Sequence, residues 1–73
     1  MTGSDPLPHF GANLRATREK LGYSQETFAQ RVGMDPAEIR RLESARRDPG
    51  VRVVTRLARG LGITPAELLK GIR

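Results

Sequence analysis

Two short helical patterns joined by a very tight turn constrain the fold of this chain most. Ser24 is a favoured N-cap residue, and it precedes the first pattern, residues 25–32. Gly33 ends that pattern, and a second one starts at Pro36 and runs to about Ser44. A glycine-containing turn of this length makes two helices cross steeply, so the sequence predicts a helix-turn-helix unit.

Three further helical patterns surround this unit, and no alternating pattern typical of a strand occurs. They cover residues 10–21, 51–61 and 65–69, and the first two end at a glycine. Their predicted inward faces comprise Phe10, Leu14, Thr17 and Leu21, then Val51, Val54, Leu57, Ala58 and Leu61. The sequence therefore predicts an all-α fold, a compact five-helix bundle in one domain of residues 9–73. Residues 1–8 are rich in glycine and proline and are predicted to form a flexible tail.

Length and composition exclude several classes of protein. A chain of 73 residues buries only about 60% of its unfolded surface, so the core is small. There is no cysteine for a disulfide or a zinc–thiolate site, and no apolar run near the length of about 20 residues that spans a membrane. His9 is the only histidine and lacks metal-ligating neighbours, and no catalytic set of residues is present. We expect a cytoplasmic, bacterial or phage-encoded, nucleoid-associated protein without enzyme activity, cofactor or metal.

The positive charge is concentrated in one part of the sequence. The net charge is +5, and residues 40–59 contain seven arginines but only two acids, Glu43 and Asp48, so this segment carries the whole excess. A localised basic cluster is typical of nucleic-acid binding. The alternative is an arginine-rich face that only keeps the protein in solution.

The second helix of the predicted unit has an outward face suited to DNA. At about 100° per residue, Ile39 and Leu42 point inward while Ala37 and Arg41 point outward. The outward face is completed by Arg40 and Ser44. Arginine can bond two acceptors on guanine, and an alanine methyl can contact the thymine methyl. An ordinary solvated helix face is the alternative.

The same angular argument places Glu43 on the inward side of that helix. A buried carboxylate needs a partner. We expect that partner to be Arg18 of the first helix, in a structural ion pair that fixes how the first and third helices dock.

Residues across nearly the whole chain resemble the Cro and phage-repressor (XRE) family of helix-turn-helix DNA-binding proteins. The matching residues are Ser24-Gln25-Glu26-Thr27-Phe28-Ala29, Gly33, Ile39, Leu42-Glu43, Pro49, Leu57-Ala58 and Leu61-Gly62. The resemblance implies that Ser24 and Gln25 hold a DNA phosphate, which also suits a helix N-terminus. It further implies that Pro36, Ala37, Glu38 and Arg41 face bases, and that Arg18 and Glu43 form a buried pair.

Three residues depart from the family pattern. Ala45 stands where the family usually has glycine, which suggests a different turn after the third helix. Pro36 occupies a position where relatives often carry a polar base-reading residue, so specificity would rest on Arg41 and on Glu38, which can accept from cytosine. Thr17 replaces a large apolar residue and thins the core.

The predicted function is sequence-specific binding of double-stranded DNA by a transcriptional regulator, a repressor or autoregulator. Arg46 and Arg47 follow the third helix and are expected to neutralise phosphates. Leu68, Leu69 and Ile72 offer more apolar surface than a short helix can bury, which predicts a homodimer through the C-terminal helix on a near-palindromic operator. The alternative is a protein-interaction module with the same fold, such as an antitoxin or a coactivator-like adaptor.

Overall fold

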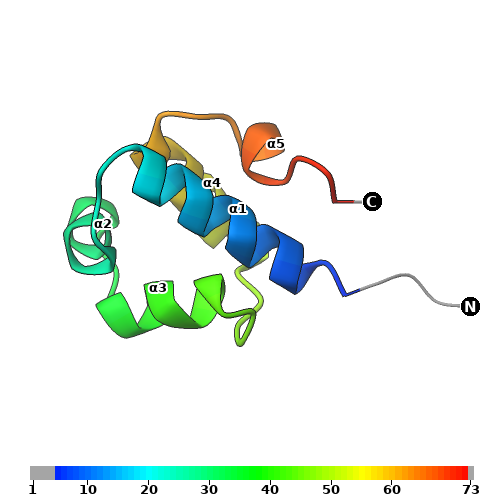
Figure 1. Cartoon of the computed structure of the whole chain (residues 1–73), viewed down its shortest axis with the longest axis horizontal. Coiled ribbons are helices and arrows are strands. Elements are labelled where there is room, and N and C mark those ends of the chain that lie inside the picture. Colours follow the sequence, from blue (N-terminus) through cyan, green and yellow to red (C-terminus); the bar gives the residue numbers. More distant parts are fainter. Residues whose placement is uncertain (1–4, 73) are drawn as a thin grey trace, which may run out of the picture.

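The computed structural model describes residues 5–72, and this range forms five helices and no strand. The helices are α1 (Leu7–Lys20), α2 (Gln25–Val32), α3 (Pro36–Glu43), α4 (Gly50–Leu61) and α5 (Pro65–Leu68). α1 crosses in front of α4, with α2 beside one end of α1, α3 below it and α5 above it (Figure 1). The predicted all-α, five-helix fold is confirmed.

Local hydrogen bonds explain why α2 and α3 begin where they do. Ser24 Oγ accepts from the Thr27 amide at 3.0 Å, and Thr27 Oγ1 accepts from the Ser24 amide at 2.9 Å, which makes a reciprocal capping box. Asp35 Oδ1 accepts from the Ala37 amide at 2.8 Å and so caps α3. Between the two helices Gly33 adopts φ 69°, a left-handed conformation that ends α2 and turns the chain.

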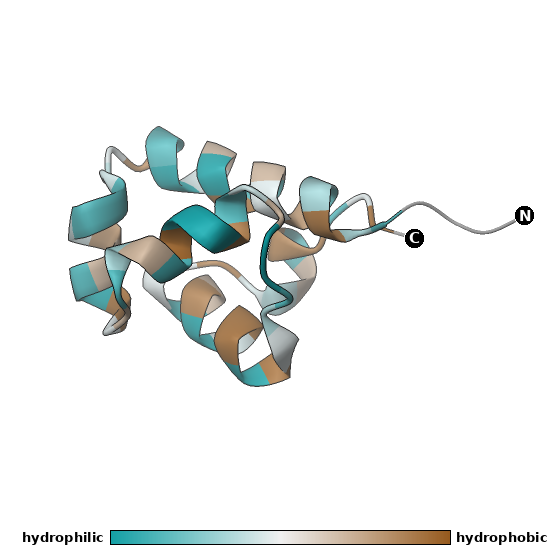
Figure 2. Ribbon diagram, turned by 90° about the horizontal axis from the view of Figure 1, so that it is seen from below, coloured by the Kyte–Doolittle hydropathy of each residue, from teal (hydrophilic) through white to brown (hydrophobic). Residues whose placement is uncertain are grey.

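The core lies where α1, α2, α3 and α4 meet, and α5 closes it. Viewed from the side of α3, that helix is mostly hydrophilic, while α4 carries more hydrophobic residues (Figure 2). The buried apolar residues are Phe10, Leu14, Phe28, Ala29, Val32, Ile39, Leu42, Val54, Leu57, Ala58, Leu61 and Leu68. None of the helices within residues 5–72 is long and apolar enough to cross a membrane.

A glycine inside α1 allows that helix to touch the backbone of α3. A Cβ atom on Gly11 would lie 2.5 Å from the carbonyl oxygen of Glu43 and 2.8 Å from that of Leu42. Any larger residue would push the two helices apart. The contact therefore fixes α1 against the C-terminal end of α3.

Polar side chains of α1 hold the C-terminal end of the described chain. Asn13 Nδ2 donates to the carbonyl oxygens of Leu68 and Lys70, both at 2.9 Å. His9 Nε2 lies 2.9 Å from the same Lys70 oxygen. These side chains bind backbone groups that α5 leaves without helical partners.

Some sequence-based expectations differ from the structure. α1 begins at Leu7, because Pro8 is tolerated in the first helical turn, so the helix includes two residues that the sequence pattern assigns to the tail. Residues 1–4 of that predicted tail lie outside the described range. Leu21 and Val51 were predicted to face inward, but they lie at helix ends and are 48% and 82% exposed. Leu68, predicted as surplus apolar surface, is completely buried.

Ala45 ends α3 in the conformation that glycine would take. Its φ is 63°, and it is the one non-glycine residue with a positive φ among residues 5–72. The Arg46 amide donates to the Arg41 carbonyl at 2.8 Å, as in a Schellman motif. The turn thus keeps the glycine-type geometry in spite of the substitution, and the expected change of shape is wrong.

Ala45→Gly is expected to raise the free energy of unfolding by about 0.5–1 kcal/mol, because a left-handed conformation costs a residue with a Cβ atom. Urea denaturation of the two proteins measures the difference. Ala16→Gly, on the exposed face of α1, is the control and should lower stability by about 1 kcal/mol. A loss of stability in Ala45→Gly would contradict the strain described above.

Candidate nucleic-acid interface

A bidentate ion pair joins α1 to α3 beneath the predicted DNA-facing surface. Arg18 Nε donates to Glu43 Oε2 at 2.6 Å, and Arg18 Nη2 donates to Glu43 Oε1 at 3.0 Å. Arg18 Nη1 donates to the Tyr23 carbonyl oxygen at 2.7 Å. The two charged side chains are only 7% and 4% exposed. The hydrogen bonds with Glu43 raise the pKa of Arg18 above its ordinary value, so the guanidinium stays charged in spite of its burial.

The same carboxylate also holds the first residue of α2. Gln25 Nε2 donates to Glu43 Oε1 at 3.0 Å. Glu43, the last residue of α3, is therefore bonded through its side chain to both α1 and α2. Gln25 was predicted to contact a DNA phosphate together with Ser24. The Ser24 hydroxyl caps α2, and one amide hydrogen of Gln25 is bonded to Glu43.

A basic groove lies between α1, the start of α2 and α3, with a volume of about 540 Å³. Its walls bring together six residues predicted to bind DNA: Gln25, Ala37, Arg40, Arg41, Ser44 and Arg46. Arg15 and Glu43 complete the lining. We call this the recognition groove. It places arginines around the small side chain of Ala37 on the outward face of α3.

Four predicted site residues lie outside the recognition groove. Ser24 is the N-cap residue of α2, and Pro36 is the first residue of α3. Glu38 and Arg47 form an ion pair with each other on the other flank of α3. In the free protein the Glu38 carboxylate, which was expected to accept from cytosine, accepts from Arg47 Nη1.

Arg15 is a groove residue that the sequence analysis missed. It forms an exposed ion pair with Glu19 one turn along α1. Gly11, Arg15 and Arg18 follow the spacing i, i+4, i+7 and so share one face of the helix. Because Gly11 and Arg18 both contact α3, this spacing is the signal that would have identified Arg15.

Comparison with known proteins identifies the family. A family model described as a helix-turn-helix domain matches residues 9–70. The chain belongs to the helix-turn-helix family.

Two relatives illustrate the kinds of protein that share this domain. An SPbeta prophage-derived uncharacterized HTH-type transcriptional regulator, YonR of Bacillus subtilis, is 32% identical over 62 residues. That match covers 85% of this chain but 57% of YonR, so the chain spans little more than half the length of that relative. Control protein C.MunI from Mycoplasma is 34% identical over 64 residues, which cover 86% of each protein.

A solved structure has the same architecture as this helix-turn-helix chain. The crystal structure of the restriction-modification controller protein C.AhdI from Aeromonas hydrophila superposes with a TM-score of 0.82 at 37% identity. The match covers 85% of this chain and 94% of that one. C.AhdI is therefore similar to this chain over most of the length of both proteins.

Removing one partner of the buried pair should cost more stability than removing both. Arg18→Met or Glu43→Leu alone leaves an unpaired buried charge and should lower the free energy of unfolding by about 3–5 kcal/mol. The double variant Arg18→Met/Glu43→Leu should lose less stability than the more destabilised of the two single variants. Urea denaturation of all four proteins completes the cycle. Losses that simply add would show that the two side chains do not act as a pair.

Proposed function

We propose that this chain is a transcriptional regulator that binds double-stranded DNA sequence-specifically through α3. The recognition groove carries the proposal, since it presents three arginines of residues 40–46 beside a small residue on the outward face of the second helix of the unit. In helix-turn-helix proteins this helix enters the major groove. The family membership and the names of the relatives support the same reading.

The residues divide into two roles in this proposal. Arg41 and Ala37 lie on the outward face of α3, where arginine reads guanine and an alanine methyl contacts thymine. Arg46 follows α3 and neutralises backbone phosphate, and the N-terminal end of α2, with Ser24 and Gln25, attracts another phosphate. We assign Arg15 to the phosphate contacts as well, because it lines the same groove.

We further propose that the chain acts as a symmetric dimer on an operator with two half-sites about 34 Å apart. An apolar groove of about 380 Å³ runs between the start of α1, the start of α4 and α5. Exposed Val51 and Leu69 border it, and Ile72 lies beside them. A second copy of the chain would cover these side chains. Leu68 is buried and so cannot take part in the dimer contact. We therefore propose that this contact includes the start of α4 as well as the C-terminal helix.

A regulatory role also separates this chain from enzymes. The relatives described above are a regulator and two controller proteins. We therefore propose no catalytic step for the chain. A protein-interaction module without DNA binding is the competing function, and the same experiment distinguishes the two.

Selection from random duplexes at about 150 mM salt tests the proposal, with salt fixed because phosphate contacts weaken as it rises. We expect one enriched motif with inverted half-sites. Arg41→Lys should weaken binding to that motif by about 5- to 150-fold and relax one base position, because lysine cannot make the bidentate contact. Arg46→Gln is the matched variant and should weaken all duplexes equally. A pool without any motif would favour the interaction module.

The dimer is tested separately from the DNA. Val51→Asp places a charge in the apolar groove and should shift the sedimentation of the protein towards monomer, while an acid at the start of α4 suits the helix dipole. Leu21→Asp is the control, since Leu21 is exposed but does not line that groove. Equal sedimentation of Val51→Asp and the unchanged protein would contradict a dimer through this surface.

A further inference from the structure

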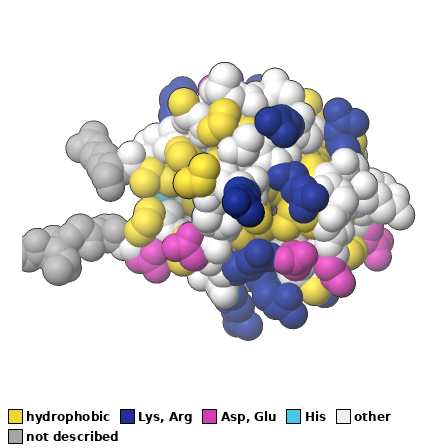
Figure 3. Space-filling view, turned by 180° about the vertical axis from the view of Figure 1, so that it is seen from behind, with side chains coloured by type: hydrophobic (Ala, Val, Ile, Leu, Met, Phe, Trp, Pro, Cys, Tyr) yellow, Lys and Arg dark blue, Asp and Glu magenta, His cyan; other side chains and the backbone are white. Residues whose placement is uncertain are grey.

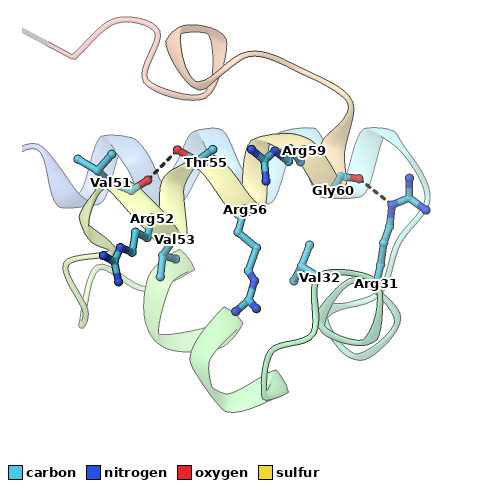
Figure 4. Close-up of a pocket in the computed structure, with 9 residues that line it drawn as sticks. All are labelled: Arg31, Val32, Val51, Arg52, Val53, Thr55, Arg56, Arg59 and Gly60. Atoms are coloured by element: carbon cyan, nitrogen blue, oxygen red, sulfur yellow. Dashed lines mark hydrogen bonds between the residues drawn. The ribbon is translucent and has the colours of Figure 1, made fainter.

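A second basic groove lies between the C-terminal end of α2 and the outer face of α4, with a volume of about 810 Å³. Its arginines are Arg31, Arg52, Arg56 and Arg59 (Figure 4). We call this the α4 groove. It shares no lining residue with the recognition groove, and the two grooves lie at opposite ends of α2.

No ion pair within residues 5–72 balances the charge of the α4 groove. No acidic side chain lines it, and none of its four arginines forms an ion pair within residues 5–72. In the space-filling view from behind, several basic side chains lie near the centre of the surface, and acidic side chains lie in its lower part (Figure 3). The α4 groove therefore presents a net positive surface to any partner.

The arrangement of these arginines opposes the stability of α4. Arg52, Arg56 and Arg59 follow the spacing i, i+4, i+7, so like charges are neighbours along one face. Arg52 also lies in the first turn of α4, which contains no acid, at the positive end of the helix dipole. Both effects are unfavourable in the free protein, and an external anion would relieve both.

One arginine is held in position by the fold. Arg31 Nε donates to the Gly60 carbonyl oxygen at 2.7 Å, and its guanidinium lies 5.5 Å from the centre of the Tyr23 ring. These contacts fix Arg31 beside the C-terminal end of α4, where Figure 4 draws it next to Gly60. The groove thus has one positioned guanidinium on α2 and a row of three on α4.

The lining between the arginines includes apolar side chains and suits a polypeptide better than a nucleic acid. Val32 and Val53 lie between the charged side chains, and both pack on the core. A DNA backbone presents phosphates and sugars to a protein, so valine side chains add little to that contact. A protein segment presents carboxylates and apolar side chains together.

We infer that the α4 groove is a docking site for an acidic segment of another protein, and that this segment carries apolar side chains between its carboxylates. The row from Arg52 to Arg59 extends about 10.5 Å along the helix axis, which matches carboxylates at i, i+4 and i+7 on a helical partner. This site is separate from the recognition groove, so the acidic segment could bind while α3 is bound to DNA. The inference does not depend on which duplex is bound.

A labelled synthetic peptide is the probe for this site. It is a helical peptide of about 16 residues with three glutamates at i, i+4 and i+7 and leucines beside them, and a scrambled peptide of the same composition is its control. Fluorescence anisotropy with the full chain at about 150 mM salt measures binding of both. We expect the ordered peptide to bind more tightly than the scrambled one, with or without the selected duplex present.

Two triple variants with equal charge locate the binding. R52Q/R56Q/R59Q should weaken peptide binding at least about tenfold and change duplex binding less than about threefold. R40Q/R41Q/R46Q should weaken duplex binding at least about tenfold and change peptide binding less than about threefold. Circular dichroism verifies that both variants keep their helices.

Several outcomes would overturn the inference. They are no difference between the two peptides, equal weakening by both triple variants, or a loss of duplex binding in R52Q/R56Q/R59Q as large as in R40Q/R41Q/R46Q. The last result would assign the α4 groove to DNA. If the selection from random duplexes yields no motif but the ordered peptide still binds, the α4 groove is supported and the proposed function is contradicted, so the two failures are distinguishable.

Discussion

The buried pair of Arg18 and Glu43 organises the surface that we propose faces DNA. A carboxylate enclosed by a small core is tolerable only when its oxygens are bonded, and Glu43 receives bonds from Arg18 and Gln25. These bonds tie the first residue of α2 and the last turn of α1 to the last residue of α3. The orientation of α3 relative to α2 is therefore held by directional bonds as well as by apolar packing. In a chain of 73 residues, where apolar burial is limited, such bonds define the angle between the two helices.

The features that the sequence predicted well are those with a local physical cause. The capping residues Ser24 and Asp35 and the glycine after α2 define the bounds of the two central helices, and the helical angle places Glu43 inward. The helix ends were harder to predict, because periodicity cannot show whether a terminal residue such as Val51 reaches the core. Side-chain pairs that form only because a loop folds back could not be predicted from the sequence either. Glu38 and Arg47 meet because the chain folds back after α3, and nothing in their spacing indicates it.

Eight arginines of this protein are divided between two grooves with different linings. In the recognition groove they surround a small residue and polar side chains, whereas in the α4 groove they surround valines. The sequence shows only one basic segment, residues 40–59, because α3 and α4 follow each other along the chain. The turn at Ala45 and the loop after it direct the two halves of that segment to different surfaces. A single cluster in the sequence thus becomes two surfaces of distinct chemistry.

The bonds from α1 to the end of α5 have a consequence for how related proteins can diverge. Asn13 and His9 contact backbone carbonyl oxygens of residues 68 and 70, which every amino acid provides. The position of the C-terminal turn is therefore independent of the side chains at residues 69 and 70, which are exposed. Mutation can change these side chains without moving the turn. Duplicated copies of such a gene within one cell could in this way acquire incompatible contact surfaces and stop forming mixed assemblies, while the fold is unchanged.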